Sequence, residues 1–180
     1  MSVNNPAQTG VGTKSQLDRT AAAPQKITTF LWFNDNAEEA ANSYVSLFKN
    51  SRIINAVPPV EGVPGPKASV LTIDFELDGQ RFTGLNGGPQ FKFTEAVSLV
   101  VHCKTQEEVD YFWEKLSEGG QKVECGWLKD KFGLFWQIVP DVVLEVFQSG
   151  DKEKTQRMMQ AVMKMKKLDI AELKKAAEGK

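Results

Sequence analysis

Alternating apolar and polar side chains are the clearest signal in this chain. Over residues 70–77, Leu71, Ile73 and Phe75 are separated by Thr72 and Asp74. A period of two predicts a strand with one buried face and one wet face. A hairpin turn follows at Asp78-Gly79. β-Branched and aromatic content predicts strands at residues 27–33, 52–57, 80–86, 96–103, 122–129 and 134–139.

Two segments instead show the spacing of amphipathic helices. Asn36 and Glu39 have the spacing of a capping box, and a helix is expected over residues 36–50. Thr105 and Glu108 predict the start of a second helix, which Gly119-Gly120 ends. A strand–helix–strands unit therefore occurs twice, which predicts an internal structural repeat.

The two ends of the chain differ from this central part. Residues 1–24 are polar and predict a flexible tail, or a segment that docks on a partner subunit. Residues 151–180 predict two helices and hold four of the five methionines, which either pack on the domain or contact another subunit. The expected organisation is a tail (1–24), a paired domain (25–150) and a helical extension (151–180).

Composition narrows the possible partners. A net charge of −1 gives no general attraction to nucleic acid or acidic membranes. No apolar run approaches the ~20 residues that span a bilayer, and no secretory signal is recognisable. The two cysteines form no CxxC pair, which favours a reducing cytoplasm.

Few residues suggest catalysis. The sequence has no glycine-rich phosphate loop after a strand and no serine-hydrolase context. Its single histidine, His102, adjoins Cys103, but neighbouring strand residues point to opposite faces and should not meet. His102 either shares a pocket with Ser98 or is a histidine at a solvent-exposed rim.

Aromatic side chains define a candidate binding surface. Phe30 and Trp32 share one strand face, opposite Leu31, and Phe135 shares a face with Gln137. A buried amide such as Gln137 needs a partner or a cavity. An apolar wall with few polar groups predicts a small-molecule site, although these side chains could also only fill a core. The predicted ligand-binding residues are Phe30, Trp32, Asn86, Ser98, His102, Trp127, Phe135 and Gln137.

Several stretches are specific in combination: residues 30–34 and 36–40, Leu85-Asn86-Gly87-Gly88-Pro89, residues 125–130, Phe132-Gly133 and residues 136–140. Together they resemble the vicinal oxygen chelate superfamily, which includes glyoxalase I and bleomycin-resistance proteins. Within it, the chain is similar over roughly residues 26–170 to the PhnB-like branch labelled 3-demethylubiquinone-9 3-methyltransferase. The resemblance implies an α+β fold in which two βαβββ modules form a curved, cup-shaped mixed sheet, followed here by C-terminal helices.

The resemblance also points to four positions where metal-binding relatives hold His, Gln or Glu. They fall near Thr28 or Thr29, near Asn86, near Ser98 and at Gln137. Neutral oxygens hold a divalent transition metal poorly. We therefore expect no metal and no cofactor.

The sequence thus predicts a metal-independent protein that binds a small molecule in an aromatic-lined cup. One alternative is an enzyme of the methyltransferase-labelled family that acts on a quinone-like or phosphonate-like molecule, with His102 and Gln137 as polarising groups. Another is a resistance protein that sequesters a toxic compound. We also expect a homodimer, because free strand edges need cover and the superfamily commonly pairs modules across subunits.

Overall fold

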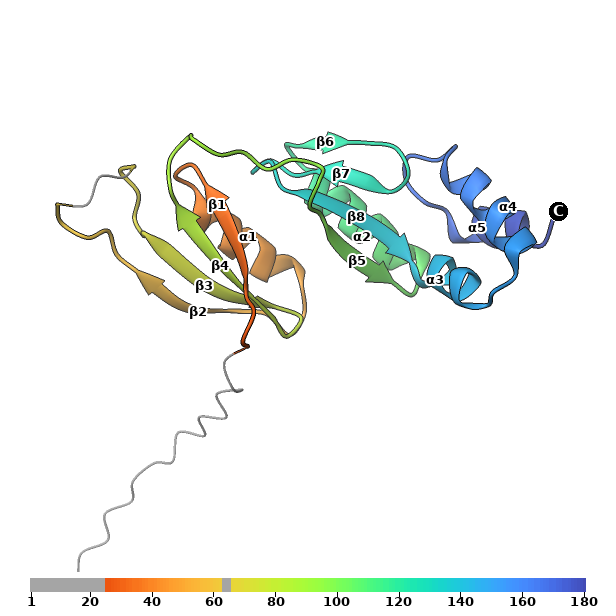
Figure 1. The fold of residues 1–180 in the computed structure, drawn as a ribbon, viewed down its shortest axis with the longest axis horizontal. Helices are drawn as coiled ribbons and strands as arrows, with labels where there is room; N and C mark the ends of the chain where they lie inside the picture. Colours follow the sequence, from red (N-terminus) through yellow and green to blue (C-terminus); the bar gives the residue numbers. More distant parts are fainter. Residues whose placement is uncertain (1–24, 63–65) are drawn as a thin grey trace, which may run out of the picture.

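Two βαβββ modules and a helical extension make up the computed structural model, which describes residues 25–62 and 66–180 (Figure 1). The first module contains β1 (Thr29–Phe33), α1 (Ala37–Leu47), β2 (Arg52–Val57), β3 (Thr72–Leu77) and β4 (Gln80–Asn86). The second contains β5 (Leu99–Cys103), α2 (Gln106–Ser117), β6 (Gln121–Lys122), β7 (Trp127–Lys129) and β8 (Phe135–Pro140). The extension contains α3 (Asp141–Gln148), α4 (Lys152–Val162) and α5 (Ile170–Ala177). The predicted tail lies outside the described residues.

Each module forms its own four-stranded mixed sheet. The strand orders are β1-β4-β3-β2 and β5-β8-β7-β6, and the first strand of each module pairs in parallel with its fourth. The predicted α+β class and the repeated module are thus confirmed. The strands form two sheets that lie side by side, with both helices behind them in the view of Figure 1. The faces of the two sheets that carry no helix, called the uncovered faces below, therefore lie on the same side of the molecule.

The alternation in the sequence sets which face of each sheet is buried. Leu31 and Phe33 of β1, and Trp136 and Ile138 of β8, belong to the main core beneath the helices. Ile73 and its neighbours in β3 follow the predicted period of two. The hairpin at Asp78-Gly79 forms as expected, with φ of 44° and 83°.

Two local predictions fail. The expected strand over residues 122–129 is divided into β6 and β7, because Cys125 and Gly126 both have positive φ (61° and 80°) and form a tight turn. The capping box at Asn36 does not form, since the Asn36 side chain makes no capping hydrogen bond. By contrast, Thr105 Oγ1 does accept from the backbone N–H of Glu108 at 3.3 Å.

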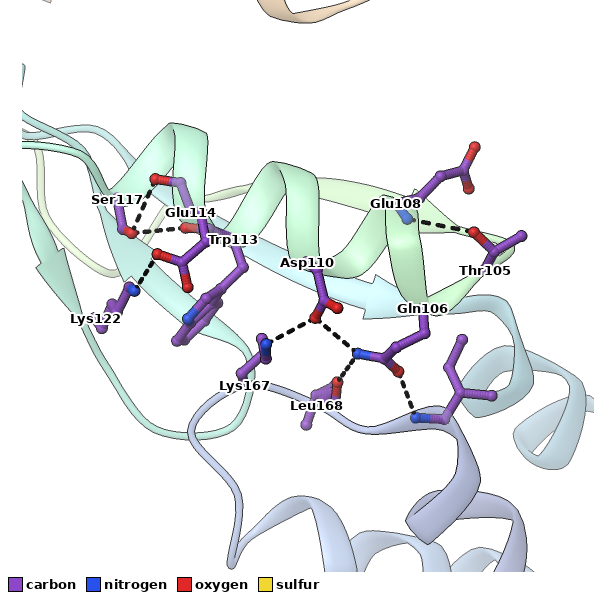
Figure 2. Close-up of polar contacts among 11 residues, drawn as sticks. Thr105, Gln106, Glu108, Asp110, Trp113, Glu114, Ser117, Lys122, Lys167 and Leu168 are labelled. Atoms are coloured by element: carbon purple, nitrogen blue, oxygen red, sulfur yellow. Dashed lines mark hydrogen bonds and ion pairs between the residues drawn. The ribbon is translucent and has the colours of Figure 1, made fainter.

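The extension has a small core of its own and is fixed to the second module. Its core includes Val143 of α3, a helix that the sequence pattern did not predict. Figure 2 shows Gln106 of α2 donating to the Leu168 carbonyl. The Oε1 atom of Gln106 also accepts from the N–H of Ile170 at 2.9 Å. Beside it, Lys167 forms an ion pair with Asp110 at 2.7 Å (Figure 2). The turn between β6 and β7 contributes two backbone donors to the same segment.

A buried carboxylate links the two modules. Asp130, the first residue of the Asp-x-x-Gly turn, is 4% exposed and accepts from the Tyr44 hydroxyl of α1 at 2.6 Å. It also accepts from Trp136 Nε1 and from the N–H groups of Phe132 and Leu134. The aromatic rings of Tyr44, Phe132 and Trp136 pack edge-to-face around it. One side chain thus fixes both the turn and the position of α1.

None of the described helices is long and apolar enough to cross a membrane.

Candidate functional site

An amide–hydroxyl pair lies on the uncovered face of the second sheet. Gln137 Nε2 donates to Ser98 Oγ at 2.8 Å, and both side chains are half-buried. Because β5 and β8 are parallel, Val100 lies next to Gln137, and Trp127 of β7 is paired with Gln137 from the other side. One N–H of Nε2 is used in this bond, so the second N–H and the Oε1 atom of Gln137 are left as a donor and an acceptor for a ligand.

Two aromatic rings extend this face. Phe135 lies two residues before Gln137 and so on the same side of β8; its side chain is 6% exposed and the Lys129 Nζ lies 5.9 Å from its ring centroid. Trp127 is half-buried beside Gln137. The face therefore combines one amide and one hydroxyl with the half-buried Trp127 ring, whereas Phe135 is nearly buried and supports the face from below.

His102 lies farther along β5, the strand that also carries Val100. It is in register with Val139 and not with Gln137, and its side chain is exposed. Val139 itself packs against the small core of the extension. The structure therefore places His102 at the margin of the face, two residues beyond Val100.

The first module carries the other predicted aromatics. Phe30 and Trp32 share the uncovered face of the first sheet, and Phe30 is 58% exposed. Trp32 Nε1 donates to the Gly88 carbonyl at 2.9 Å, and its ring meets Phe91 edge-on. A Cβ on Gly87 would lie 2.3 Å from the Trp32 ring, so only glycine fits there.

Asn86 does not lie on the predicted face. Its side chain is 2% exposed beneath α1, where Oδ1 accepts from the N–H of Ala37 at 2.8 Å and Nδ2 donates to the Val70 carbonyl at 2.9 Å. Asn86 thus satisfies the first free N–H of α1, which Asn36 leaves uncapped. The strand alternation contained this result, since Asn86 has the same parity as buried Phe82.

Polar side chains that were not predicted to bind a ligand share the face of Trp32. Thr83 of β4 donates to Asp74 of β3 at 2.6 Å. Glu76 lies 3.5 Å from Arg52 and 3.9 Å from Arg81 across the strands. The alternation over residues 70–77 was the signal that could have identified these side chains, because its polar positions lie on the uncovered face.

The four positions implied for a metal do not converge. Ser98 and Gln137 are in contact, but Asn86 is turned toward α1. Thr29 has the parity of buried Leu31, whereas exposed Thr28 has the parity of Phe30, on the first sheet and not beside Gln137. In the described part of the chain, no group of three or more His, Cys, Asp or Glu side chains is arranged to hold a metal ion. The donors that meet are a neutral amide and a hydroxyl, which do not fit a transition metal.

The chain matches a family model described as 3-demethylubiquinone-9 3-methyltransferase over residues 25–139. A putative 3-demethylubiquinone-9 3-methyltransferase, a PhnB protein from Bacillus cereus, is 40% identical; the match covers 64% of this chain and 99% of that one, with a TM-score of 0.60. Protein PA1353 from Pseudomonas aeruginosa is 17% identical, with coverages of 65% and 98% and a TM-score of 0.56.

A glyoxalase/bleomycin resistance protein from Albidiferax ferrireducens is 13% identical, with coverages of 63% and 95% and a TM-score of 0.42. A comparison with curated proteins found no match. Helices α3 to α5 lie beyond the matched residues, whereas the two modules are covered. The chain therefore belongs to the 3-demethylubiquinone-9 3-methyltransferase family, the PhnB-like branch that the sequence predicted.

Proposed function

We propose that this protein binds a small, partly aromatic or apolar molecule on the uncovered sheet faces, without a bound transition metal. The observation that carries the proposal is the Gln137–Ser98 pair among Trp127, Phe135 and Val100. This arrangement has the usual composition of a small-molecule site, an apolar wall with a few polar groups that orient the ligand. Phe30 and Trp32 would extend this binding surface onto the first sheet, since the uncovered faces of both sheets lie on the same side of the molecule.

Binding is favoured over methyl transfer by the two strand–helix junctions. A nucleotide-like cofactor in a doubly wound fold lies on a glycine-rich turn between the first strand and its helix. Here those junctions are Asn34-Asp35-Asn36 and Lys104-Thr105, neither of which contains glycine. The family description names a methyltransferase, but for this chain we propose ligand binding in the cup and no methyl transfer.

We also propose that a second copy of the chain completes the site. We further propose that the protein is located in the cytoplasm. Phe30, Phe91 and Val97 are 58%, 65% and 66% exposed on or beside the uncovered faces. Apolar side chains gathered in this way are typical of a surface that a partner covers. A homodimer would remove them from water and would close the cup from above.

Native mass spectrometry of freshly purified protein tests the proposal by searching for a co-purified small molecule. Gln137→Leu should weaken its retention by ~1–3 kcal/mol, because a ligand donor would lose its acceptor. Gln121→Leu, an exposed strand amide on the same sheet, is the matched control. Equal retention by both variants would contradict the site.

Elemental analysis tests the metal-free part separately. We expect no stoichiometric zinc, nickel, iron or manganese, because the converging donors are neutral. A value close to one metal ion per chain would overturn this part. In that case the Gln137–Ser98 pair would need a further ligand, and loss of the metal in Gln137→Leu would identify the site.

A further inference from the structure

A groove of about 850 Å³ lies between the two modules. It is lined by the end of α1, the β3–β4 turn, the outer edge of β5 and the start of α2. Its volume lies within the ~300–1,000 Å³ that small-molecule pockets occupy. Of the residues predicted to bind a ligand, it includes only His102. It also includes Val100, so the groove meets the proposed cup at the edge strand β5, but Gln137, Ser98, Trp127 and Phe135 do not line it.

The groove has an aromatic floor. Phe48 of α1 stacks on Phe112 of α2, with ring centroids 4.8 Å apart and an interplanar angle of 22°. Phe48 also stacks on Trp136, at 5.8 Å and 20°. Tyr111 is 42% exposed at the rim, and its hydroxyl donates to the Leu47 carbonyl at 3.4 Å. A flat ring system could stack on this surface.

The rim is more acidic than basic. Asp78, Glu107 and Glu108 line it, against one lysine, Lys49. Glu108 Oε2 accepts from the N–H of Lys104. The Glu107 side chain is exposed, and hydrogen bonds from its own N–H and from the Thr105 hydroxyl lower the pKa of its carboxyl, which keeps it negatively charged. The last turn of α1 carries no basic residue, so the partial negative charge of its carbonyl end is uncompensated within the helix.

We propose that this groove is a second binding site, for a molecule with a flat aromatic body and one cationic, amine-type group. The ring stacks against Phe48 and Phe112, and the cation lies between the Glu107 carboxylate and the exposed face of Tyr111. A cation gains both from a nearby carboxylate and from an aromatic face. The groove shares only β5 residues with the cup, and neither Glu107 nor Tyr111 belongs to the cup, so this site does not require that Gln137 binds a ligand.

The test is a fluorescence titration of the full chain with acriflavine, a flat aromatic cation, and with anilinonaphthalene sulfonate, an aromatic anion of similar size. We expect saturable binding of one acriflavine per chain and weaker binding of the anion. Glu107→Gln and Tyr111→Ser should each weaken acriflavine binding by about three- to tenfold, the size expected of one exposed charge or one cation–aromatic contact. Circular dichroism checks that the variants fold.

Two control variants separate binding in the groove from binding in the cup and from a general effect of surface charge. Glu172 occupies the first turn of α5 as Glu107 does that of α2, so Glu172→Gln should leave the affinity unchanged. Gln137→Leu should also leave it unchanged. Equal affinity for the anion, equal loss in Glu172→Gln, or loss in Gln137→Leu would overturn the proposal. The proposal would also be overturned if acriflavine bound only at protein concentrations low enough to give monomer. That result would show that the groove is covered by a second subunit.

Discussion

Asn86 shows how a residue expected to bind a ligand can instead hold the fold together. Its amide joins the start of α1 to the Val70 carbonyl across segments distant in sequence. Asn86→Ala should lower the free energy of unfolding by about 2–4 kcal/mol, because a buried N–H and a buried carbonyl would both lose their partner. Urea denaturation measures this change.

The exposed Asn55 of β2 provides the comparison for Asn86. Asn55→Ala should change stability by no more than ~0.5 kcal/mol. Retention of the co-purified ligand by folded Asn86→Ala protein should be unchanged. A stable Asn86→Ala variant that loses the ligand would return Asn86 to the binding site.

Asp130 gives the protein a defined pH dependence. Burial raises the pKa of its carboxyl above the ordinary 3.8, although the hydrogen bonds from Tyr44 and Trp136 act in the opposite direction. The Asp130 carboxyl therefore binds its proton more tightly in the folded state than in the unfolded state. The stability that this preference contributes is fully present below pH 3.8 and is lost as the pH rises through the folded-state pKa.

Urea denaturation of wild type and Asp130→Asn between pH 3 and 7 measures this contribution. The advantage of the wild type over the variant should decline as the pH rises and then stay constant. A carbon-13 titration of the Asp130 carboxyl in the wild type gives a second measurement that needs no variant. A midpoint below 3.8 would show that hydrogen bonding outweighs burial.

At the scale of elements, the β6–β7 turn attaches the extension to the second module. The N–H groups of Cys125 and Gly126 each donate at 2.7 Å, to the carbonyls of Met165 and Lys166 respectively. Gly126 has φ of 80°, and a Cβ there would lie 2.8 Å from the Ile138 carbonyl oxygen and 3.1 Å from Leu168. A side chain at this position would therefore push the turn away from both neighbours.

Gly126→Ala should loosen the extension and cost about 2–4 kcal/mol, from backbone strain together with the steric conflict. Hydrogen exchange of residues 163–170 should accelerate. Gly150→Ala is the matched control, because Gly150 also has positive φ (72°) but open space around it. It should cost only the ~1–2 kcal/mol of the backbone conformation. Equal effects of the two variants would show that contact with Leu168 and Ile138 contributes nothing.

At the scale of the whole molecule, the uncovered sheet faces bear on the proposed dimer. Light scattering at micromolar concentration should give twice the 20.0 kDa chain mass. Phe30→Asp should shift the mass toward one chain, since a charge would be buried against a partner. Ile54→Asp, at a 41% exposed position of β2, should leave it unchanged. A single-chain mass for the wild type would remove the dimer from the proposal.

Local patterns in the sequence determined much of this protein. The period of two in residues 70–77, the Asp78-Gly79 turn and the Thr105 cap each involve neighbours along the chain, and each appears as predicted. The same alternation placed Leu31 and Trp136 in the core, and Phe30 and Gln137 opposite them. The motifs were also specific enough to identify the family.

The tertiary structure decided the partners of polar groups, which local patterns do not contain. A buried amide or carboxylate takes whichever donors the fold brings to it. Asn86 therefore caps a helix 49 residues away in sequence, and Asp130 binds Tyr44 at a separation of 86. The two sheets and the groove depend likewise on how the modules pack. These features depend on how distant segments pack together, which the apolar–polar alternation within any one segment does not specify.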